Sequence, residues 1–522
     1  SCFALNPAYI RLEEVGVLSD KEAMKQFRKQ QQALNKLPQV DYDAVIAAKW
    51  DYLHRIFAQE GERTLASPSF KRFYQDNKSW LRPYAAFCYL RDKYGTPDYT
   101  QWGDDSVYNA DHDEAVGPIY LYIQYHLHQQ LKHAADYAHS HGVVLKGDIP
   151  IGISRTSVEA WCHPGLFCLE SQAGAPPDAF ARDGQNWGFP TYNWRAMAAE
   201  RYHWFAQRFT KMADYFDAYR IDHLLGFFRI WEIPGHTKSG LLGHFNPAMP
   251  LTVEEINAAG ISFYKERHAM PFSLADETDV LFVEDPYQPG CYHPRINGFE
   301  TESFKALPEN ERKAFYALHD NFYYHRHNDF WYGEAMKKLP ALVDSTEMLV
   351  CGEDLGMIPA CVPAVMDELR ILSLEIQRMP KAYGCSVDNP ANYPYYSVCT
   401  TSTHDMSGVR GWWAEDPTLT QYYWTELLHQ RGKAPLDCEA WICENIVRQH
   451  LDSPAMLTIL PLQDWMAIDE HLRYPDPSFE RINVPANPFN YWRYRMHLTL
   501  EELLEADDFN RQVRRLVGQS GR

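Results

Sequence analysis

Hydrophobic and polar positions follow two patterns along the chain. In the first, apolar residues recur three or four positions apart, as Ile46 and Trp50 do, which is the spacing of an amphipathic helix. Ser19 followed by Glu22 matches a capping box ahead of the first long helix. This pattern predicts a mainly helical insertion over residues 13–115.

The second pattern begins near residue 142 and consists of short apolar runs that are followed by polar or acidic clusters. Five runs contain an acidic residue at or near their end: GVVLKGD at Asp148, DAYRID at Asp222, EMLVCGED at Glu353, YSVCTTSTHD at Asp405 and LTILPLQD at Asp464. A sixth run, ILSLEIQRM over Ile371–Met379, has no acidic end. Such runs are typical of buried parallel strands, and helical patterns lie between them. The sequence therefore predicts an α/β fold, a (β/α)₈ TIM-type barrel with helical insertions.

The distance between two of these runs predicts a second insertion. Asp222 and Glu353 are 131 residues apart, far more than one strand, loop and helix require. We expect residues 235–345 to form a lid or a groove wall rather than an independent domain. The whole chain, 1–522, is then one catalytic barrel domain.

Charge and composition exclude several classes of protein. With 50 basic and 69 acidic side chains the formal charge is −19, which argues against binding nucleic acid or anionic membranes. No stretch has the roughly 18 uninterrupted apolar residues of a membrane span, and the N-terminus does not resemble a signal peptide. The 11 cysteines are scattered without CxxC pairs, so we expect reduced thiols and a cytoplasmic protein.

The acids at the strand ends are the candidate catalytic residues. In a (β/α)₈ barrel the carboxyl ends of the strands face one active site, so Asp222, Glu353 and Asp405 are expected to converge there. Two carboxylates about 5 to 5.5 Å apart catalyse glycosyl transfer with retention, and a third can stabilise positive charge on the sugar. Alternatively, each acid only caps the helix that follows its strand.

Two neighbours strengthen this interpretation. Arg220 lies two residues before Asp222, hence on the same face of a strand, where it can keep the carboxylate ionised and oriented. His404 precedes Asp405 and can donate a hydrogen bond to a sugar hydroxyl. A structural ion pair and a core histidine are the alternatives.

A Pro- and Gly-interrupted segment, 173–194, is expected to be a long ordered loop. Its polar and aromatic side chains suit hydrogen bonds to hydroxyls and stacking on sugar faces: Asp178, Gln185, Asn186, Trp187, Tyr192 and Trp194. The alternative is a surface loop held by aromatic packing. No HExxH, EF-hand or P-loop signature is present, and we expect neither a metal nor an organic cofactor.

Several of these motifs together resemble glycoside hydrolase family 77, the 4-α-glucanotransferases that include amylomaltases and disproportionating enzymes. They are GAPPDAFARDGQNWGFPTYNW, AYRIDHLLGFFRIWEIP, CGEDLG and TSTHD, and the likeness runs from SCFALNP to RINVPANPFNYWRYR. The long segment before Glu353, with LKGDIPIG and ACVPAVMDEL, is most similar to the cytosolic disproportionating enzymes of plants and their bacterial relatives.

The resemblance implies a role for each matching residue. Asp222 would be the nucleophile, Glu353 the general acid/base and Asp405 the transition-state stabiliser, with Arg220 orienting Asp222. The residues expected to contact substrate are Asp148, His223 and His404 at the donor site, Asp178, Gln185 and Trp187 on a loop over the cleft, and Asn483 late in the chain.

The implied activity is retaining transfer of glucosyl or maltosyl units from maltose or malto-oligosaccharides to glycogen or another soluble glucan. An α-amylase-type hydrolase uses the same three acids and remains an alternative, as does an inactive glucan-binding fragment. Family members carry a first barrel strand and a Ser-Pro-Tyr element ahead of the SxFAxNP motif, and the plant branch carries starch-binding modules. The chain begins after these, so we expect it to lack the first strand of the barrel.

Overall fold

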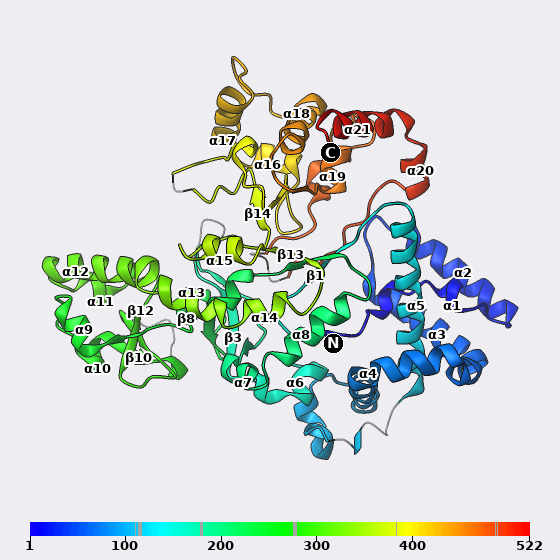
Figure 1. The fold of residues 1–522 in the computed structure, drawn as a ribbon, viewed down its shortest axis with the longest axis horizontal. Coiled ribbons are helices and arrows are strands. Elements are labelled where there is room, and N and C mark those ends of the chain that lie inside the picture. The colour runs from blue at the N-terminus through cyan, green and yellow to red at the C-terminus, as the bar shows by residue number, and fades with distance from the viewer. Residues whose placement is uncertain are drawn as a thin grey trace. The chain divides into compact units, whose positions relative to one another are not determined.

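The chain folds into two compact units whose residues interleave along the sequence. The computed structural model describes residues 1–109, 111–112, 117–177, 181–274, 279–382, 384–485, 487 and 489–522. The first unit comprises Ser1–Val15 and Ile56–Leu369, and the second comprises Gly16–Arg55 and Arg370–Arg522. Helix α3 (Tyr42–Ala66) therefore begins in the second unit and ends in the first (Figure 1). In the described ranges, no helix is both long and apolar enough to cross a membrane.

A parallel sheet of three strands lies in the first unit. Strand β6 (Ala218–Ile221) pairs with β1 (Lys146–Ile149) on one side and with β13 (Leu349–Gly352) on the other. Among the α-helices of this unit are α1 (Leu12–Val15), α4 (Pro68–Tyr94), α5 (Pro118–Ser140), α6 (Val158–Cys162), α7 (Trp194–Ala199), α8 (His203–Met212), α14 (Leu339–Val343), which lies at the end of the expected insertion, and α15 (Val362–Glu368). These strands confirm the strand prediction for the runs that contain Asp148, Asp222 and Glu353.

The first unit also contains two antiparallel arrangements that the apolar pattern does not predict. One sheet has the order β4-β3-β7-β8, and the other has the order β10-β11-β12-β9, in which only β10 and β11 are parallel. Their strands are β3 (Ser171–Ala175), β4 (Gln185–Asn186), β7 (Ile230–Pro234), β8 (His244–Asn246), β9 (Leu251–Thr252), β10 (Ala269–Pro271), β11 (Phe282–Glu284) and β12 (Cys291–Pro294). A further pair joins β2 (Phe167–Cys168) to β5 (Thr191–Tyr192).

Helices cover the segment expected to be the second insertion. They are α9 (Val253–Ala258), α10 (Lys265–His268), α11 (Glu302–Lys305), α12 (Glu309–Asp320), a π-helical turn (Asn321–His325) and α13 (Asn328–Met336). In Figure 1, α9 to α12 gather with β10 and β12 at one end of the first unit. The segment is thus a mixed α/β substructure.

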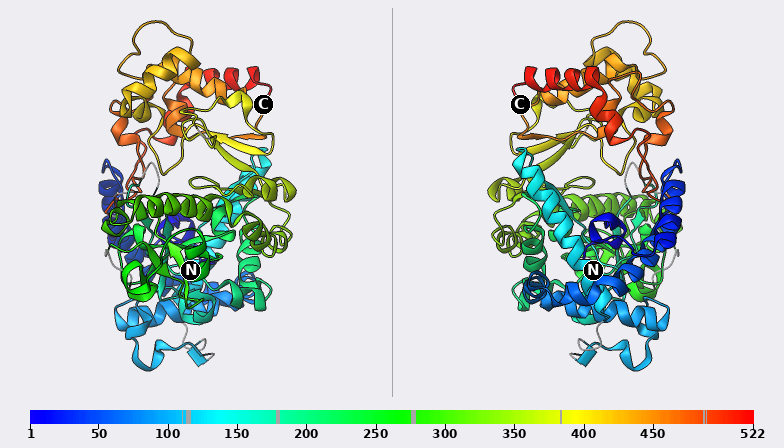
Figure 2. Two further views of the ribbon diagram at one scale, coloured as in Figure 1. Left: turned by 90° about the vertical axis from the view of Figure 1, so that its left-hand side faces the viewer. Right: turned by 90° about the vertical axis from the view of Figure 1, so that its right-hand side faces the viewer.

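The second unit contains the other parallel sheet, with β15 (Ser397–Thr400) between β14 (Ser373–Ile376) and β16 (Leu457–Thr458). Its other helices are α2 (Lys21–Asn35), α16 (Val409–Glu415), α17 (Pro417–Tyr422), a π-helical turn (Tyr423–Leu427), α18 (Ala440–Leu451), α19 (Leu462–Met466), α20 (Leu500–Glu505) and α21 (Asp507–Gln519). Figure 2 shows these strands and helices together, in yellow to red. Trp412, Trp413 and Tyr423 pack in the core between the helices.

The start of helix α2 differs from the expected capping box by one residue. Asp20 is the N-cap, and its carboxylate accepts hydrogen bonds from the backbone N–H groups of Glu22 and Ala23. The prediction of Ser19 as the cap was therefore wrong. An ionised carboxylate is favoured at this position because it satisfies two otherwise unpaired N–H groups and interacts with the helix dipole.

Candidate active site

The register of the parallel sheet brings two predicted acids to one edge. Ile221 of β6 pairs with Gly352 of β13, and the next residue on each strand is Asp222 or Glu353. The N–H of Asp222 donates to the carbonyl of Ile149 at 3.0 Å, and the N–H of Glu353 donates to the carbonyl of Ile221 at 2.9 Å. Asp222 and Glu353 therefore lie side by side at the carboxyl edge of the sheet.

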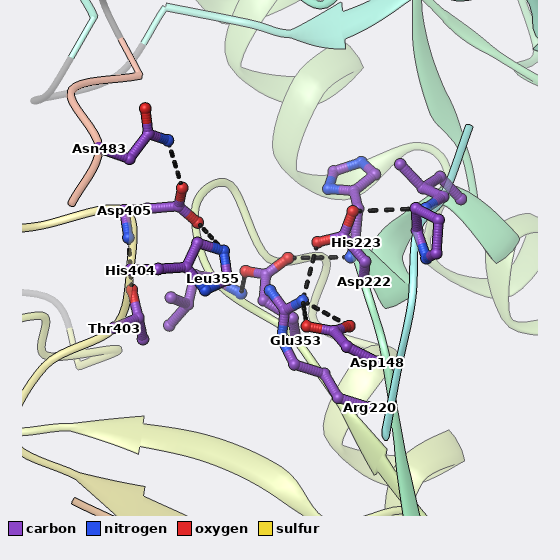
Figure 3. A network of polar contacts seen from close by, with 12 residues as sticks. Asp148, Arg220, Asp222, His223, Glu353, Leu355, Thr403, His404, Asp405 and Asn483 are labelled. Atoms are coloured by element: carbon purple, nitrogen blue, oxygen red, sulfur yellow. Dashed lines mark hydrogen bonds and ion pairs between the residues drawn. The ribbon is translucent and has the colours of Figure 1, made fainter. Parts of the chain in front are cut away.

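Arg220 connects two carboxylates at this edge (Figure 3). Its Nη1 lies 2.9 Å from both carboxylate oxygens of Asp148 and 3.0 Å from Oδ1 of Asp222. The side chain is only 14% exposed, and burial lowers the pKa of the guanidinium. The charges of Asp148, Asp222 and Glu353 outweigh burial and leave that pKa above its ordinary value. The ion pair expected between Arg220 and Asp222 is thus present.

Glu353 has the environment of a carboxylic acid that exchanges a proton near neutral pH. Its Oε2 accepts the backbone N–H of His223 at 3.1 Å, and its Oε1 accepts that of Leu355 at 3.0 Å. Burial raises the pKa of Glu353 to about 7; Arg220 lowers it and Asp222 raises it. Burial thus dominates over the two hydrogen bonds, which favour the ionised form.

His223 has an unusual backbone conformation. Its φ is +48°, in the left-handed region, which directs its N–H toward Glu353. Burial, with Arg229 and Arg220 nearby, lowers the pKa of the imidazole to about 3, so the ring is neutral. The ring makes an edge contact with Trp187, with 4.9 Å between centroids. Strain of this kind at a non-glycine residue is common at functional sites.

The predicted binding loop, 173–194, is held by strands β3 and β4. Trp187 donates its backbone N–H to the carbonyl of Ala173 and its indole N–H to Oε1 of Gln185, the latter at 3.1 Å. Trp187 thus contacts His223, the residue after Asp222, and its hydrogen bond holds Gln185 next to it. Asp178 lies outside the described residues.

Three other residues of this loop, also suggested to bind sugars, make contacts within the protein. Tyr192 is buried and donates its hydroxyl to the carbonyl of Ile151. Trp194 packs between Phe205 and Phe227. Asn186 accepts the N–H of Gly188 and donates to the carbonyl of Thr237. These side chains stabilise the loop, as the alternative of an aromatic-packed loop proposed.

In the second unit, Asp405 lies in a hydrogen-bonded cluster on the loop after β15. Nδ2 of Asn483 donates to Oδ1 of Asp405 at 2.9 Å, and Nε2 of His404 lies 3.1 Å from Oδ2 (Figure 3). Asn490 in turn donates to Oδ1 of Asn483, and the ring of Trp492 lies 5.0 Å from that of His404. Sequence reasoning missed Asn490 and Trp492, although the aromatic run FNYW after Asn483 could have indicated them.

Asp464, the last of the strand-end acids, has a structural role. It is 2% exposed and accepts hydrogen bonds from the hydroxyls of Thr401 and Ser402, each at 2.6 Å, and from the N–H of Val409 at 2.8 Å. All three donors belong to the segment that contains His404 and Asp405. Asp464 thus anchors the loop of the candidate stabiliser from within the core.

Comparison with known proteins identifies the family. The model of the glycoside hydrolase 77 family, described as 4-alpha-glucanotransferase, matches residues 1–500. The chain is 38% identical to the rice (Oryza sativa subsp. japonica) 4-alpha-glucanotransferase DPE2 over all of its own length and 63% of the rice protein. It is 25% identical to the 4-alpha-glucanotransferase of Chlamydia muridarum, with 96% of this chain and 81% of that protein covered.

Solved structures show the fold. An amylomaltase from Streptococcus agalactiae in complex with acarbose aligns with a TM-score of 0.69 and 18% identity over all of this chain and 88% of its own. An amylomaltase from Corynebacterium glutamicum aligns with a TM-score of 0.64 and 17% identity over all of this chain and 66% of its own. The chain belongs to glycoside hydrolase family 77 and has the α/β fold of its members, a (β/α)₈ TIM-type barrel with insertions. It spans somewhat less than two thirds of its rice relative.

Proposed function

We propose that the protein is a retaining 4-α-glucanotransferase. The observation that carries the proposal is the pairing of a guanidinium-bound carboxylate, Asp222, with a carboxyl of pKa about 7, Glu353, on adjacent strands. One group is suited to remain ionised and attack, and the other is suited to give and take a proton. Family membership and the names of the relatives support this activity.

The first half of the reaction cleaves the donor. The ionised carboxylate of Asp222 attacks the anomeric carbon, and the protonated carboxyl of Glu353 gives its proton to the departing 4-oxygen. A covalent glucosyl ester on Asp222 and a shortened donor result. Arg220 positions Asp222 for the attack through the ion pair at 3.0 Å.

The second half transfers the sugar to an acceptor. Glu353, now ionised, removes the proton from the 4-hydroxyl of an acceptor glucan, whose oxygen attacks the anomeric carbon and displaces Asp222. A new α-1,4 bond forms with the original configuration. Two inversions explain the retention, and both steps use only side chains of the protein.

The remaining predicted residues have supporting roles in this proposal. The hydrogen-bonded carboxylate of Asp405 stabilises the positive charge that develops on the donor sugar. The residues proposed to bind sugar hydroxyls or rings are Asp148, His223, His404, Asp178, Gln185, Trp187 and Asn483. Trp187 also limits the access of water to the covalent intermediate, because its ring contacts the residue next to the nucleophile.

The proposed substrates are maltose or malto-oligosaccharides as donors and glycogen or another soluble glucan as acceptor. The acarbose complex of the streptococcal amylomaltase supports a site for glucan-like sugars. We also place the protein in the cytoplasm, which buried thiols such as Cys351 and Cys399 support.

Incubation with maltose, with and without glycogen, tests the activity. A transferase releases one glucose for each glucosyl unit added to the glucan, and the Asp222→Asn variant does neither while it remains folded. Release of two glucoses per maltose without an acceptor would instead identify a hydrolase. Glucan binding that survives Asp222→Asn, with no turnover in either protein, would identify a glucan-binding protein.

A further inference from the structure

Three side chains of kinds that bind metals meet in the first unit, and none of them has a role in the proposed reaction. His244 lies at the start of β8, Asp285 follows β11, and His293 lies within β12. One ligand atom from each lies within 4.8 Å of the other two. The three residues are 1%, 6% and 2% exposed, so the cluster is buried in the protein.

The two antiparallel arrangements together build the cluster. Val283 of β11 pairs with His293 of β12, and the N–H of Asp285 donates to the carbonyl of Cys291 at 2.8 Å. Asp285 and His293 are therefore diagonal neighbours on one face of this hairpin. His244 comes from the other sheet, and its ring lies 4.5 Å from that of His293.

The hydrogen bonds of the cluster leave ring nitrogens without partners. Nε2 of His293 lies 2.6 Å from Oδ2 of Asp285, which accounts for these two side chains as a pair. Neither ring nitrogen of His244, nor Nδ1 of His293, has a hydrogen-bond partner among the described residues. Buried imidazole nitrogens are normally hydrogen-bonded or bound to a metal. The hydrogen bond between His293 and Asp285 does not satisfy the ring nitrogens of His244.

The charges around the cluster favour a cation. Glu232 of β7 pairs in register with His244, and its carboxylate is fully buried among Thr191, Asn246 and Tyr287. Within the described part of the chain, neither Glu232 nor Asp285 forms an ion pair with a lysine or an arginine. The basic group paired with these two buried acids is the imidazole of His293, which contacts Asp285, and a divalent cation would balance their charge more fully.

We propose that His244, Asp285 and His293 bind a zinc ion. Two imidazoles and a carboxylate suit Zn²⁺, and a buried water molecule would complete the tetrahedron. With bonds of about 2.0 Å, tetrahedral ligand atoms lie about 3.3 Å apart, so the ion draws the three side chains together from their present spacing. The ion joins β8 to the β11–β12 hairpin and has a structural role, and the residues match no metal motif because they come from separate strands.

Metal analysis of the tag-free chain tests the proposal. After incubation with Zn²⁺ and removal of the excess, elemental analysis is expected to find about one zinc per chain. The same chain treated with a chelator is expected to unfold at a lower temperature and to recover when Zn²⁺ alone is added. Co²⁺ in place of Zn²⁺ is expected to give the visible absorption of a tetrahedral site.

Matched histidine variants assign the ligands. His244→Gln is expected to lose the bound zinc and the response to added Zn²⁺. His319→Gln is the control, because His319 is buried in the same insertion but bonds the carbonyl of Ile296. A wild-type chain that holds no zinc and does not respond to it would overturn the proposal, even if His244→Gln fails to fold. Undiminished zinc binding in His244→Gln would also overturn it.

Discussion

The backbone N–H of His223 donates to Oε2 of Glu353 at 3.1 Å, so the residue after the proposed nucleophile holds the proposed acid/base. The carbonyl of Glu353 in turn accepts the N–H of Leu224 at 2.9 Å. The second bond joins the two backbones, and the first holds the carboxyl group of Glu353 in one orientation beside Asp222. Pre-organisation of this kind lowers the cost of reaching the reactive geometry.

Replacing Glu353 by glutamine removes the proton donor and keeps the side-chain shape. We expect kcat/KM on maltose to fall by about 10²- to 10⁴-fold, the usual contribution of general acid/base catalysis. Cleavage of maltosyl fluoride is expected to fall much less, because fluoride leaves without a proton. Glu347→Gln, an exposed glutamate close to the same strand, is the control. Equal losses on both donors would contradict the acid role.

The pH profile follows from the pKa of about 7 at Glu353. Donor cleavage needs the protonated form, whose fraction decreases as the pH rises through that value. We therefore expect kcat/KM on maltose to fall about tenfold per pH unit above pH 7. Glu353→Gln acting on maltosyl fluoride is expected to lack this alkaline limb. A wild-type profile that stays flat to pH 9 would show that another group supplies the proton.

Removing the charge of Arg220 affects the nucleophile. Arg220→Met is expected to lower kcat and to move the acidic limb of the pH profile upward, because a carboxylate without its cation is protonated more easily. Lys211→Met removes a cation that pairs with Asp214 in the same unit and is expected to change neither quantity. Initial rates across the acidic range measure the shift, and an unmoved limb would refute this role of Arg220.

Trp187→Ala tests whether the loop limits access of water to the intermediate. With maltose and glycogen, we expect a larger share of glucosyl units to go to water, seen as more free glucose per unit of glucan growth. Trp187→Phe keeps an aromatic ring next to His223 and is expected to restore part of the transfer. The proposal for this residue fails if Trp187→Ala changes the rate and leaves that ratio unaltered.

Asp464 allows a prediction about stability rather than chemistry. Asp464→Asn weakens three hydrogen bonds to a buried carboxylate and is expected to lower the free energy of unfolding by about 1 to 3 kcal/mol. Urea unfolding of this variant and of Glu470→Gln, an exposed neighbour, measures the effect. An unchanged midpoint for Asp464→Asn would show that the carboxylate does not anchor the loop.

The parallel strands were predictable because their cores are short apolar runs. All six expected runs overlap a strand, including β14 within Ile371–Met379, but β1 begins only at Lys146, after the exposed Val143 and Val144, and includes Asp148. The antiparallel strands were not predicted, because segments such as SQAGA in β3 and HFN in β8 lack the apolar run that indicates a buried strand. An acid after a strand can have a structural or a catalytic role, and the sequence pattern does not tell the two apart. Asp464 is buried and bonds the loop after β15, whereas Asp222 is paired with Arg220 at the candidate site.

The sequence also did not show which side chains of the loop 173–194 are buried, because that depends on how they pack. Trp187 contacts His223, whereas Tyr192 of the same loop is buried and Trp194 packs against Phe205. A sequence shows that a loop is rich in aromatic residues and not which rings are buried. The cluster of His244, Asp285 and His293 was missed for a similar reason, since strand pairing and not spacing brings it together.

The interleaving of the two units has a consequence for how the protein is made. Within the second unit, the N–H of Val40 donates to the carbonyl of Arg493 at 3.0 Å, and Arg495 donates to the carbonyl of Asn35 at 3.0 Å. In a nascent chain, Val40 and Asn35 cannot form these bonds until Arg493 and Arg495, more than 400 residues later, have been added. We therefore expect the surface of the early segment, residues 16–55, to be open to non-native contacts during synthesis.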